Sequence, residues 1–191
     1  LPMLENAGAV VFTPRERDWQ RNEIIVDNDG AGSYQEVKSR KGKWKTTSTP
    51  GFALKRNIYV DGQNPFTEGT ARYANTEKKA EKAFAQWIPT IPETGKYAVY
   101  VSYQSLPESV TDAKYLVFHK GGVTEFLVNQ QIGGGTWVYL GSFEFDKGYN
   151  DYGMVVLSNQ SKQKGVVCAD AVRFGGGMGN IARGGQTSGL P

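Results

Sequence analysis

Residues 97–103 read YAVYVSY, a run in which every second side chain falls on the same face of an extended chain. Tyrosine and valine fill the odd positions, and the even positions hold Ala98, Tyr100 and Ser102. Alternation with this period is typical of a β-strand that has one buried face. The run therefore predicts a half-buried strand.

A hairpin is predicted directly downstream of this strand. Residues 115–119 and 123–128 are rich in β-branched and aromatic side chains, and they flank Lys120, Gly121 and Gly122. Glycine reaches the positive φ angles that a tight turn between antiparallel strands needs. The two runs are therefore expected to pair with each other.

Three more strand-like runs follow, at residues 136–145, 154–157 and 166–174. Turn-forming residues fill the intervals 146–152 and 158–165. Short strands separated by turns at this spacing are typical of folds built from two sheets. The sequence predicts an all-β fold class, a β-sandwich of the jelly-roll, galactose-binding-like type.

One stretch, EKAFAQWIP, fits two patterns. Ala83 and Trp87 lie one helical turn apart among good helix formers. Phe84, Gln86 and Ile88 alternate equally well before a proline. The hydrophobic period alone does not decide between a helix and a strand here.

The composition excludes two classes of partner. The net charge of +3 comes from 22 basic and 19 acidic residues, which is too slight an excess for the basic stripe of a nucleic-acid-binding protein. No apolar run approaches the ~20 residues that a membrane-spanning helix needs. The densest basic run surrounds Trp44 and is interpreted as a solvated hairpin loop. We expect no nucleic acid partner and no membrane span.

The sequence also lacks the combinations of residues that common catalytic sites require. Cys168 is the single cysteine, so no internal disulfide can form, and its apolar neighbours predict a buried thiol. His119 is the single histidine and falls beside the predicted hairpin turn, and no catalytic Ser-His-Asp set is expected with it. The glycine runs 133–135 and 175–177 do not open a helix that carries a phosphate-binding lysine. The sequence predicts no catalytic residue, no metal site and no cofactor.

The two ends differ in character from the middle. Residues 4–18 are interpreted as the end of a helix, a break at Gly8 and a short strand, which is an α/β pattern. The last segment holds seven of the 24 glycines and is interpreted as a connector. Because Leu1 is not an initiator methionine, we expect a fragment of a larger protein. The expected organisation is a flanking segment at 1–19, a β-sandwich module at 20–174 and a Gly-rich connector at 175–191.

Several short motifs occur in an order that resembles a known family. They are WIPTIPETGKYAVYVSY at 87–103, DAKYLVFHKGG at 112–122, VNQ at 128–130, LSN at 157–159 and ADAVRF at 169–174, together with Trp137, Leu140, Gly141, Phe143 and Gly148. The order is similar to that of the golvesin C-terminal domain, also called the xanthan-lyase carbohydrate-binding-like domain, over about residues 52–174. With the alternation described above, the resemblance predicts a strand over residues 81–88.

The flanks resemble a second family. Residues 4–18 are similar to the segment of N-acetylmuramoyl-L-alanine amidases that runs from a helix into the second strand. In some bacterial proteins described as xanthan lyases, the sandwich is inserted directly after such a strand, and residues 188–191 would lie where the chain returns to a helix. The amidase zinc ligands are two histidines and a glutamate. With His119 alone, the resemblance implies no zinc site in this chain, and we expect a structural or surface role for His119.

Glycan binding by a sandwich needs aromatic rings that stack on sugars. The candidate carbohydrate-binding residues are Trp44, Trp137, Tyr139 and Tyr103, with Tyr34 as a further aromatic. Trp44 has the best case for exposure because charged residues surround it. Trp137 and Tyr139 are same-face neighbours, and the alternative is that they fill the core.

Two acidic positions are left open. Asp27, Asn28, Asp29 and Gly30 form a fragment of a Ca²⁺-binding loop without its later glutamate, so an Asx-turn is the preferred interpretation. Asp170 has three possible roles: it caps a turn, pairs with Arg173, or joins a cation site. The sequence does not choose among them.

Three functions are compared. The first is a non-catalytic accessory module that binds polysaccharide or peptidoglycan for the remainder of a parent enzyme, itself a xanthan lyase or an amidase-like hydrolase. The second is a structural insertion that shapes the active-site entrance of a zinc amidase-like hydrolase. The third, a lyase in its own right, lacks a base and a charge neutraliser in one cluster. The first is preferred, with a secreted, periplasmic or cell-surface location.

Overall fold

The computed structural model describes residues 22–30, 33–38, 43–56 and 58–176. One sheet has four antiparallel strands in the order β1-β14-β7-β10, namely β1 Glu23–Asp27, β14 Ala171–Gly175, β7 Gly95–Val101 and β10 Val138–Phe145. A second sheet has five antiparallel strands, which in spatial order are β2 Tyr34–Lys38, β5 Ala83–Trp87, β12 Met154–Ser158, β8 Ala113–His119 and β9 Gly122–Val128.

Two smaller sheets complete the fold. One contains β13 Val166–Ala169, β4 Arg72–Asn75 and β3 Trp44–Thr46, and the other contains β11 Gly148–Tyr149 and β6 Thr90–Ile91. The short 3-10 helix η1 spans Pro65–Thr67, and the described residues form no α-helix. None of the described segments is a helix long and apolar enough to span a membrane.

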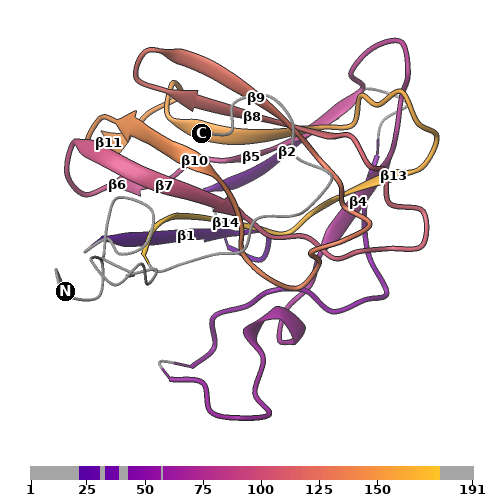
Figure 1. Cartoon of the computed structure of the whole chain (residues 1–191), viewed down its shortest axis with the longest axis horizontal. Helices are drawn as coiled ribbons and strands as arrows, with labels where there is room; N and C mark the ends of the chain where they lie inside the picture. Colours follow the sequence, from indigo (N-terminus) through magenta and orange to yellow (C-terminus); the bar gives the residue numbers. More distant parts are fainter. Residues whose placement is uncertain (1–21, 31–32, 39–42, 57, 177–191) are drawn as a thin grey trace, which may run out of the picture.

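The two larger sheets lie as stacked layers, with β8 and β9 in one layer and β7, β10 and β1 in the other (Figure 1). The core between them contains fully buried side chains from both layers, including Val99, Tyr115, Phe126, Leu157 and Phe174. The prediction of an all-β sandwich is confirmed. The flank predicted at 1–19 lies outside the described residues, as does the connector predicted at 175–191 apart from Gly175, which ends β14, and Gly176.

The ambiguous stretch is a strand, as predicted. In β5, Ala83, Ala85 and Trp87 are buried. Phe84 and Gln86 are only partly buried on the opposite face. β5 pairs with β2 on one side and β12 on the other. Because strand preference depends on packing and pairing, two neighbouring strands outweigh the helical spacing of these residues.

β7 differs from its prediction in one respect, since its second face is also buried. Ala98 and Tyr100 are fully buried, and they form a small cluster with Tyr139 on the side of the sheet opposite the main core. Alternation identified the strand correctly, but apolar residues at the even positions allow burial on both faces. The expectation of a half-buried strand is therefore wrong.

The predicted hairpin is present. β8 and β9 pair from Ala113 with Val128 to His119 with Gly122. Gly121 has a backbone φ of 108°, which residues other than glycine rarely adopt. The remaining predicted strands correspond to β10, β12 and the pair β13 and β14, which Asp170 separates.

The described chain enters and leaves the sandwich at one place. β1 and β14 are antiparallel neighbours, with Glu23 opposite Gly175. The Gly176 N–H donates to the Asn22 carbonyl at 3.1 Å. Asn22, directly before β1, therefore lies beside Gly176, directly after β14.

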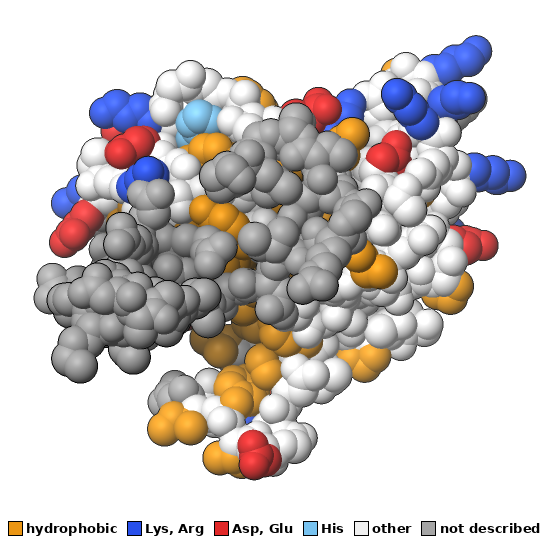
Figure 2. All heavy atoms as spheres, in the orientation of Figure 1, with side chains coloured by type: hydrophobic (Ala, Val, Ile, Leu, Met, Phe, Trp, Pro, Cys, Tyr) orange, Lys and Arg blue, Asp and Glu red, His pale blue; other side chains and the backbone are white. Residues whose placement is uncertain are grey.

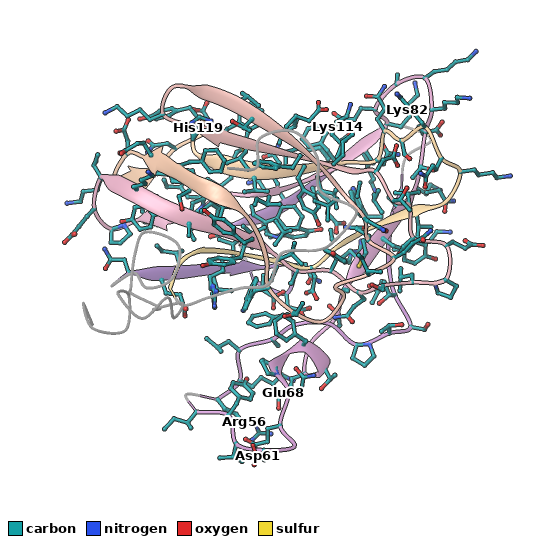
Figure 3. The ribbon with its side chains drawn as sticks, in the orientation of Figure 1. Arg56, Asp61, Glu68, Lys82, Lys114 and His119 are labelled. Atoms are coloured by element: carbon teal, nitrogen blue, oxygen red, sulfur yellow. The ribbon has the colours of Figure 1, made fainter. Side chains whose placement is uncertain are left out.

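A lobe formed by residues 52–68 projects from the sandwich, and hydrophobic side chains lie at the lower end of the view in Figure 2. Leu54, Ile58 and Val60 are its exposed aliphatic residues. The Tyr59 hydroxyl donates to Glu68 at 3.1 Å, and Arg56 forms an ion pair with Glu68 at the same distance (Figure 3). These bonds hold the lobe in one shape.

Candidate functional site

The predicted sugar-binding aromatics are mostly buried. The side chain of Trp44 is 7% exposed, Tyr139 4% and Tyr103 0%. Trp44 faces the core because it alternates with the exposed Lys45 along β3. The expectation that Trp44 is exposed is therefore wrong, since charged neighbours in sequence point to the other face of the strand.

Trp137 is the partly accessible member of the four candidates. Its ring lies 5.1 Å from the ring of Phe52 and 5.5 Å from that of Phe66. Tyr139 packs against Tyr100, at 5.5 Å between ring centroids, and Trp137 packs against the same cluster. Tyr139 is buried there and Trp137 is partly accessible, and the sugar-binding role of each stays a prediction.

A groove crosses the outer face of the β13-β4-β3 sheet. It consists of two adjoining hollows of about 490 and 540 Å³, which share Pro107 and Glu108. We call it the Tyr73 groove. Its other lining residues are Thr46, Thr47, Ser48, Tyr73, Asn75, Thr76, Leu106, Ser109, Val110, Gln131, Gln163, Lys164, Gly165 and Val166.

Strand alternation places the floor of this groove. In β4, Ala74 points into the core, so Tyr73 and Asn75 point to the outside. The neighbouring wall approaches closely because residue 165 is glycine. A Cβ at Gly165 would lie 2.3 Å from the Glu108 carbonyl oxygen, so no larger residue fits there.

Hydrogen bonds fix the walls of the Tyr73 groove. The Thr76 hydroxyl donates to the Gln163 carbonyl at 2.7 Å and accepts from the Gly165 N–H at 2.9 Å. The Gln131 amide donates to the Ser109 carbonyl at 3.0 Å. The groove is therefore shaped before any ligand arrives.

Four polar side chains in the groove remain available. Within the described part of the chain, the side chains of Tyr73, Asn75, Glu108 and Lys164 have no hydrogen bond or ion pair to protein groups. An aromatic ring offers an apolar face, an amide both donates and accepts, and the two opposite charges bond to hydroxyl groups. Such a set suits a polyhydroxylated ligand such as a sugar.

The adjacent Glu36–Arg72 pocket differs because its polar groups are occupied. It has a volume of about 430 Å³. Arg72 binds both carboxylate oxygens of Glu36 at 2.7 Å, and the Tyr34 hydroxyl donates to Glu36 at 2.7 Å. Burial would raise the pKa of Glu36, but the bonds from Arg72 and Tyr34 lower it overall. This network links β2 to β4 and is structural.

Asp27 and Asp170 form a buried carboxyl pair. Their side chains are hydrogen-bonded to each other, and the Asp170 carboxylate also accepts from the Phe52 N–H at 2.9 Å. The Asn28 amide nitrogen, in the orientation that satisfies both ends of the amide, donates to both carboxylates. Burial, followed by the nearby negative charges, raises the pKa of Asp27 to about 8 and that of Asp170 to about 7. One of the two carboxyl groups therefore holds a proton near neutral pH.

The open acidic positions are thereby assigned. The Asp27 carboxylate accepts from the backbone N–H of Asp29, which is the predicted Asx-turn. Asp170 tethers the start of the projecting lobe through the Phe52 N–H rather than pairing with an arginine. Within the described ranges, no group of three His, Cys, Asp or Glu side chains is placed to hold a metal ion.

The single cysteine and histidine have packing roles. Burial raises the pKa of Cys168 to about 12, so the thiol stays protonated. The His119 ring nitrogens lie 3.1 Å from the Lys120 carbonyl and 3.0 Å from the Thr124 hydroxyl. His119 also packs on Phe143, at 4.7 Å between ring centroids. Both residues stabilise the sandwich.

Sequence reasoning missed the Tyr73 groove. The available signal was the alternation in RYAN, residues 72–75, where Ala74 separates two polar positions. Four residues are too few to establish a period, and no strand was predicted there. Most other lining residues come from 106–110 and 163–166, which only the tertiary fold brings to Tyr73.

Comparison with known proteins gives consistent results. A family model described as the Golvesin C-terminal domain matches residues 24–176. A xanthan lyase of Bacillus sp. (strain GL1) is 32% identical over 154 residues, which cover 79% of this chain and 14% of that protein. The solved structure of a Paenibacillus xanthan lyase superposes with a TM-score of 0.61 and 25% identity, and covers 81% of this chain and 13% of that one. The chain spans about a seventh of the length of these relatives.

Proposed function

Because the chain belongs to the golvesin C-terminal domain family, as a module related to the xanthan lyases, we propose that it holds polysaccharide for a larger secreted enzyme and does no chemistry itself. The Tyr73 groove is the binding site. The observation that carries this proposal is a preformed groove whose aromatic, amide, carboxylate and ammonium groups have no described protein partner. Xanthan, named by the relatives, is the first ligand to test, and peptidoglycan is the second.

Tyr73→Ala is expected to weaken binding of xanthan oligosaccharides roughly tenfold, since an aromatic contact contributes about 0.5–1.5 kcal/mol beyond its buried area. The measurement is calorimetric titration, with folding checked by circular dichroism. Tyr152→Ala is the matched control, because Tyr152 is 50% exposed in a turn far along the chain. The assignment of the site to this groove would be contradicted if Tyr73→Ala bound xanthan oligosaccharides as tightly as wild type. It would also be contradicted if only Trp137→Ala, with its fold intact, lost affinity.

The chain alone is expected to have no hydrolase or lyase activity and to bind no zinc in stoichiometric amount. A catalytic zinc usually takes three protein ligands, and His119 is the single histidine of the sequence. Elemental analysis after dialysis and product assays on xanthan and muramoyl-peptide substrates provide the test. Turnover that is abolished by His119→Ala would contradict this prediction.

A purely structural insertion is the second candidate function. It is favoured by the position of the chain ends of the sandwich, since β1 and β14 are neighbours and the module can interrupt a host fold at one point. Under this alternative, residues 20–174 are the inserted module. Residues 1–19 belong to the amidase-like host fold, and residues 175–191 connect the module back to it. Titrations in which wild type binds neither xanthan nor peptidoglycan at any salt concentration would favour it.

A further inference from the structure

A further hollow adjoins the two hollows that form the Tyr73 groove. It has a volume of about 440 Å³ and shares Gln163 with the groove. We call it the lysine hollow. Its lining residues are Lys78, Lys114, Lys162, Asp112, Glu125, Leu127, Gln160, Ser161 and Gln163.

The lysine hollow is built on a rigid frame. The Asn159 side chain accepts from the N–H groups of Lys82 and Ala83 at 2.9 Å, and it donates to the Asn75 carbonyl at 2.9 Å. The Glu77 N–H also donates to the Asn159 carbonyl, and the Glu77 carbonyl accepts from the Ser161 N–H. Because Asn75 lines the Tyr73 groove and Asn159 bonds to it, these bonds fix the segment that carries Lys162 relative to the floor of that groove.

The hollow carries an excess of positive charge. Three lysines face two carboxylates, and the Asp112 oxygens already accept from the Ser161 hydroxyl and the Lys162 N–H. In the part of the chain that the structure describes, the ammonium groups of Lys78 and Lys162 have no ion pair. Lys and Arg side chains gather in the upper right of Figure 2, where Figure 3 labels Lys82 and Lys114.

The chemistry of the hollow differs from that of the groove beside it. The groove contains one carboxylate, Glu108, and one ammonium, Lys164, whose charges sum to zero. The hollow has a net charge of about +1, supplied by lysines without an arginine. Lysine is a compact point charge that bonds to an anion without the fixed bidentate geometry of an arginine fork. One monovalent anion balances this charge.

We propose that the lysine hollow binds a carboxylate substituent of the same polysaccharide whose uncharged sugar ring lies on Tyr73. This inference rests on the proposed function and names its ligand class, an acidic polysaccharide. The chain would bind one uncharged sugar unit of that polymer at Tyr73 and a carboxylate group of the same polymer in the lysine hollow. Gln163 lines the lysine hollow and the adjoining half of the Tyr73 groove, and Tyr73 itself lines the other half of that groove.

The test compares xanthan with carboxyl-reduced xanthan, so that the sugar chain is kept and the charge removed. At 20 mM NaCl, the wild-type chain is expected to bind the native polymer roughly five- to tenfold more tightly than the reduced polymer, because exposed charge contacts are individually weak. The preference should disappear at 300 mM NaCl, where screening is strong. The variant Lys78→Ala/Lys162→Ala should bind both polymers equally and match the wild-type affinity for the reduced one.

The matched control is Lys55→Ala/Lys147→Ala, which removes two exposed lysines outside the hollow and leaves the same net charge as the test variant. It should keep the preference for the native polymer. The inference is overturned if Lys78→Ala/Lys162→Ala keeps that preference too, or if dextran sulfate displaces native xanthan as well as a carboxylated glycan does. Binding of the reduced polymer with no effect of Lys78 and Lys162 would defeat this inference and leave the proposed function standing, whereas absence of binding to either polymer would defeat both.

Discussion

Trp87→Ala is expected to lower the free energy of unfolding by about 3–5 kcal/mol, as large-to-small changes of buried aromatic residues do. Trp87 is 0% exposed, and its ring packs against Tyr34 and Tyr115, at 5.5 and 6.4 Å between centroids. Its indole N–H donates to the Asp170 carbonyl at 3.1 Å, so the variant also leaves a buried acceptor without that donor. Urea denaturation followed by tryptophan fluorescence and circular dichroism measures the loss.

Phe84→Ala is the matched control for this change. Phe84 lies on the same strand, β5, but on the opposite, partly exposed face. We expect Phe84→Ala to lower the free energy of unfolding by clearly less, about 1 kcal/mol, because the Phe84 side chain buries less apolar surface than that of Trp87. Similar losses for the two variants would show that the core does not lie on the Trp87 face of β5.

Raising the pH from 5 to 9 is expected to lower the free energy of unfolding by about 2–4 kcal/mol, since a shift of one pKa unit corresponds to about 1.4 kcal/mol. The carboxyl pair is the cause. In the folded chain the pKa values are about 8 for Asp27 and about 7 for Asp170, against an ordinary value of 3.8. The folded state holds protons that the unfolded chain has released, so stability falls as the pH rises through the folded values.

Asp27→Asn isolates this contribution. An amide at position 27 can donate to Asp170 without a titrating proton, so the variant should lose most of the pH dependence and be more stable than wild type at pH 9. Asp61→Asn is the control, because Asp61 is exposed on the projecting lobe (Figure 3). Equal slopes of stability against pH in wild type and Asp27→Asn, measured by urea denaturation at several pH values, would contradict the assignment.

Alternation predicted the elements of the sandwich better than it predicted which faces are exposed. It identified β7, β8, β9, β10 and β12, because long runs of β-branched and aromatic residues have few other stable arrangements. The prediction that Trp44 is exposed was wrong because β3 has only three residues, and charged neighbours in sequence do not show which face of so short a strand meets solvent. The direction of a side chain in so short a strand depends on its pairing with β4, which local sequence does not encode.

The candidate site was beyond sequence reasoning for a different reason. Tyr73, Glu108 and Lys164 are each unremarkable in their local sequence, and they meet because β4 pairs with β13 and residues 108–110 bond to Val166. The aromatic residues that the sequence offered as sugar-binding candidates were Trp44, Tyr103 and Tyr139, which are buried, and Trp137, which is partly buried. Tyr73 was not among them.

The neighbouring positions of Asn22 and Gly176 also determine how the module responds to mechanical load. A tether that pulls on the polypeptide before β1 and after β14 acts on two antiparallel strands from the same end. Such a force opens the backbone bonds from Glu23 and Gly175 onwards one pair after another, rather than shearing all of them together. The first event under tension is therefore the peeling of β1 from β14, while the β13-β4-β3 sheet, which carries the Tyr73 groove, contains neither of these strands.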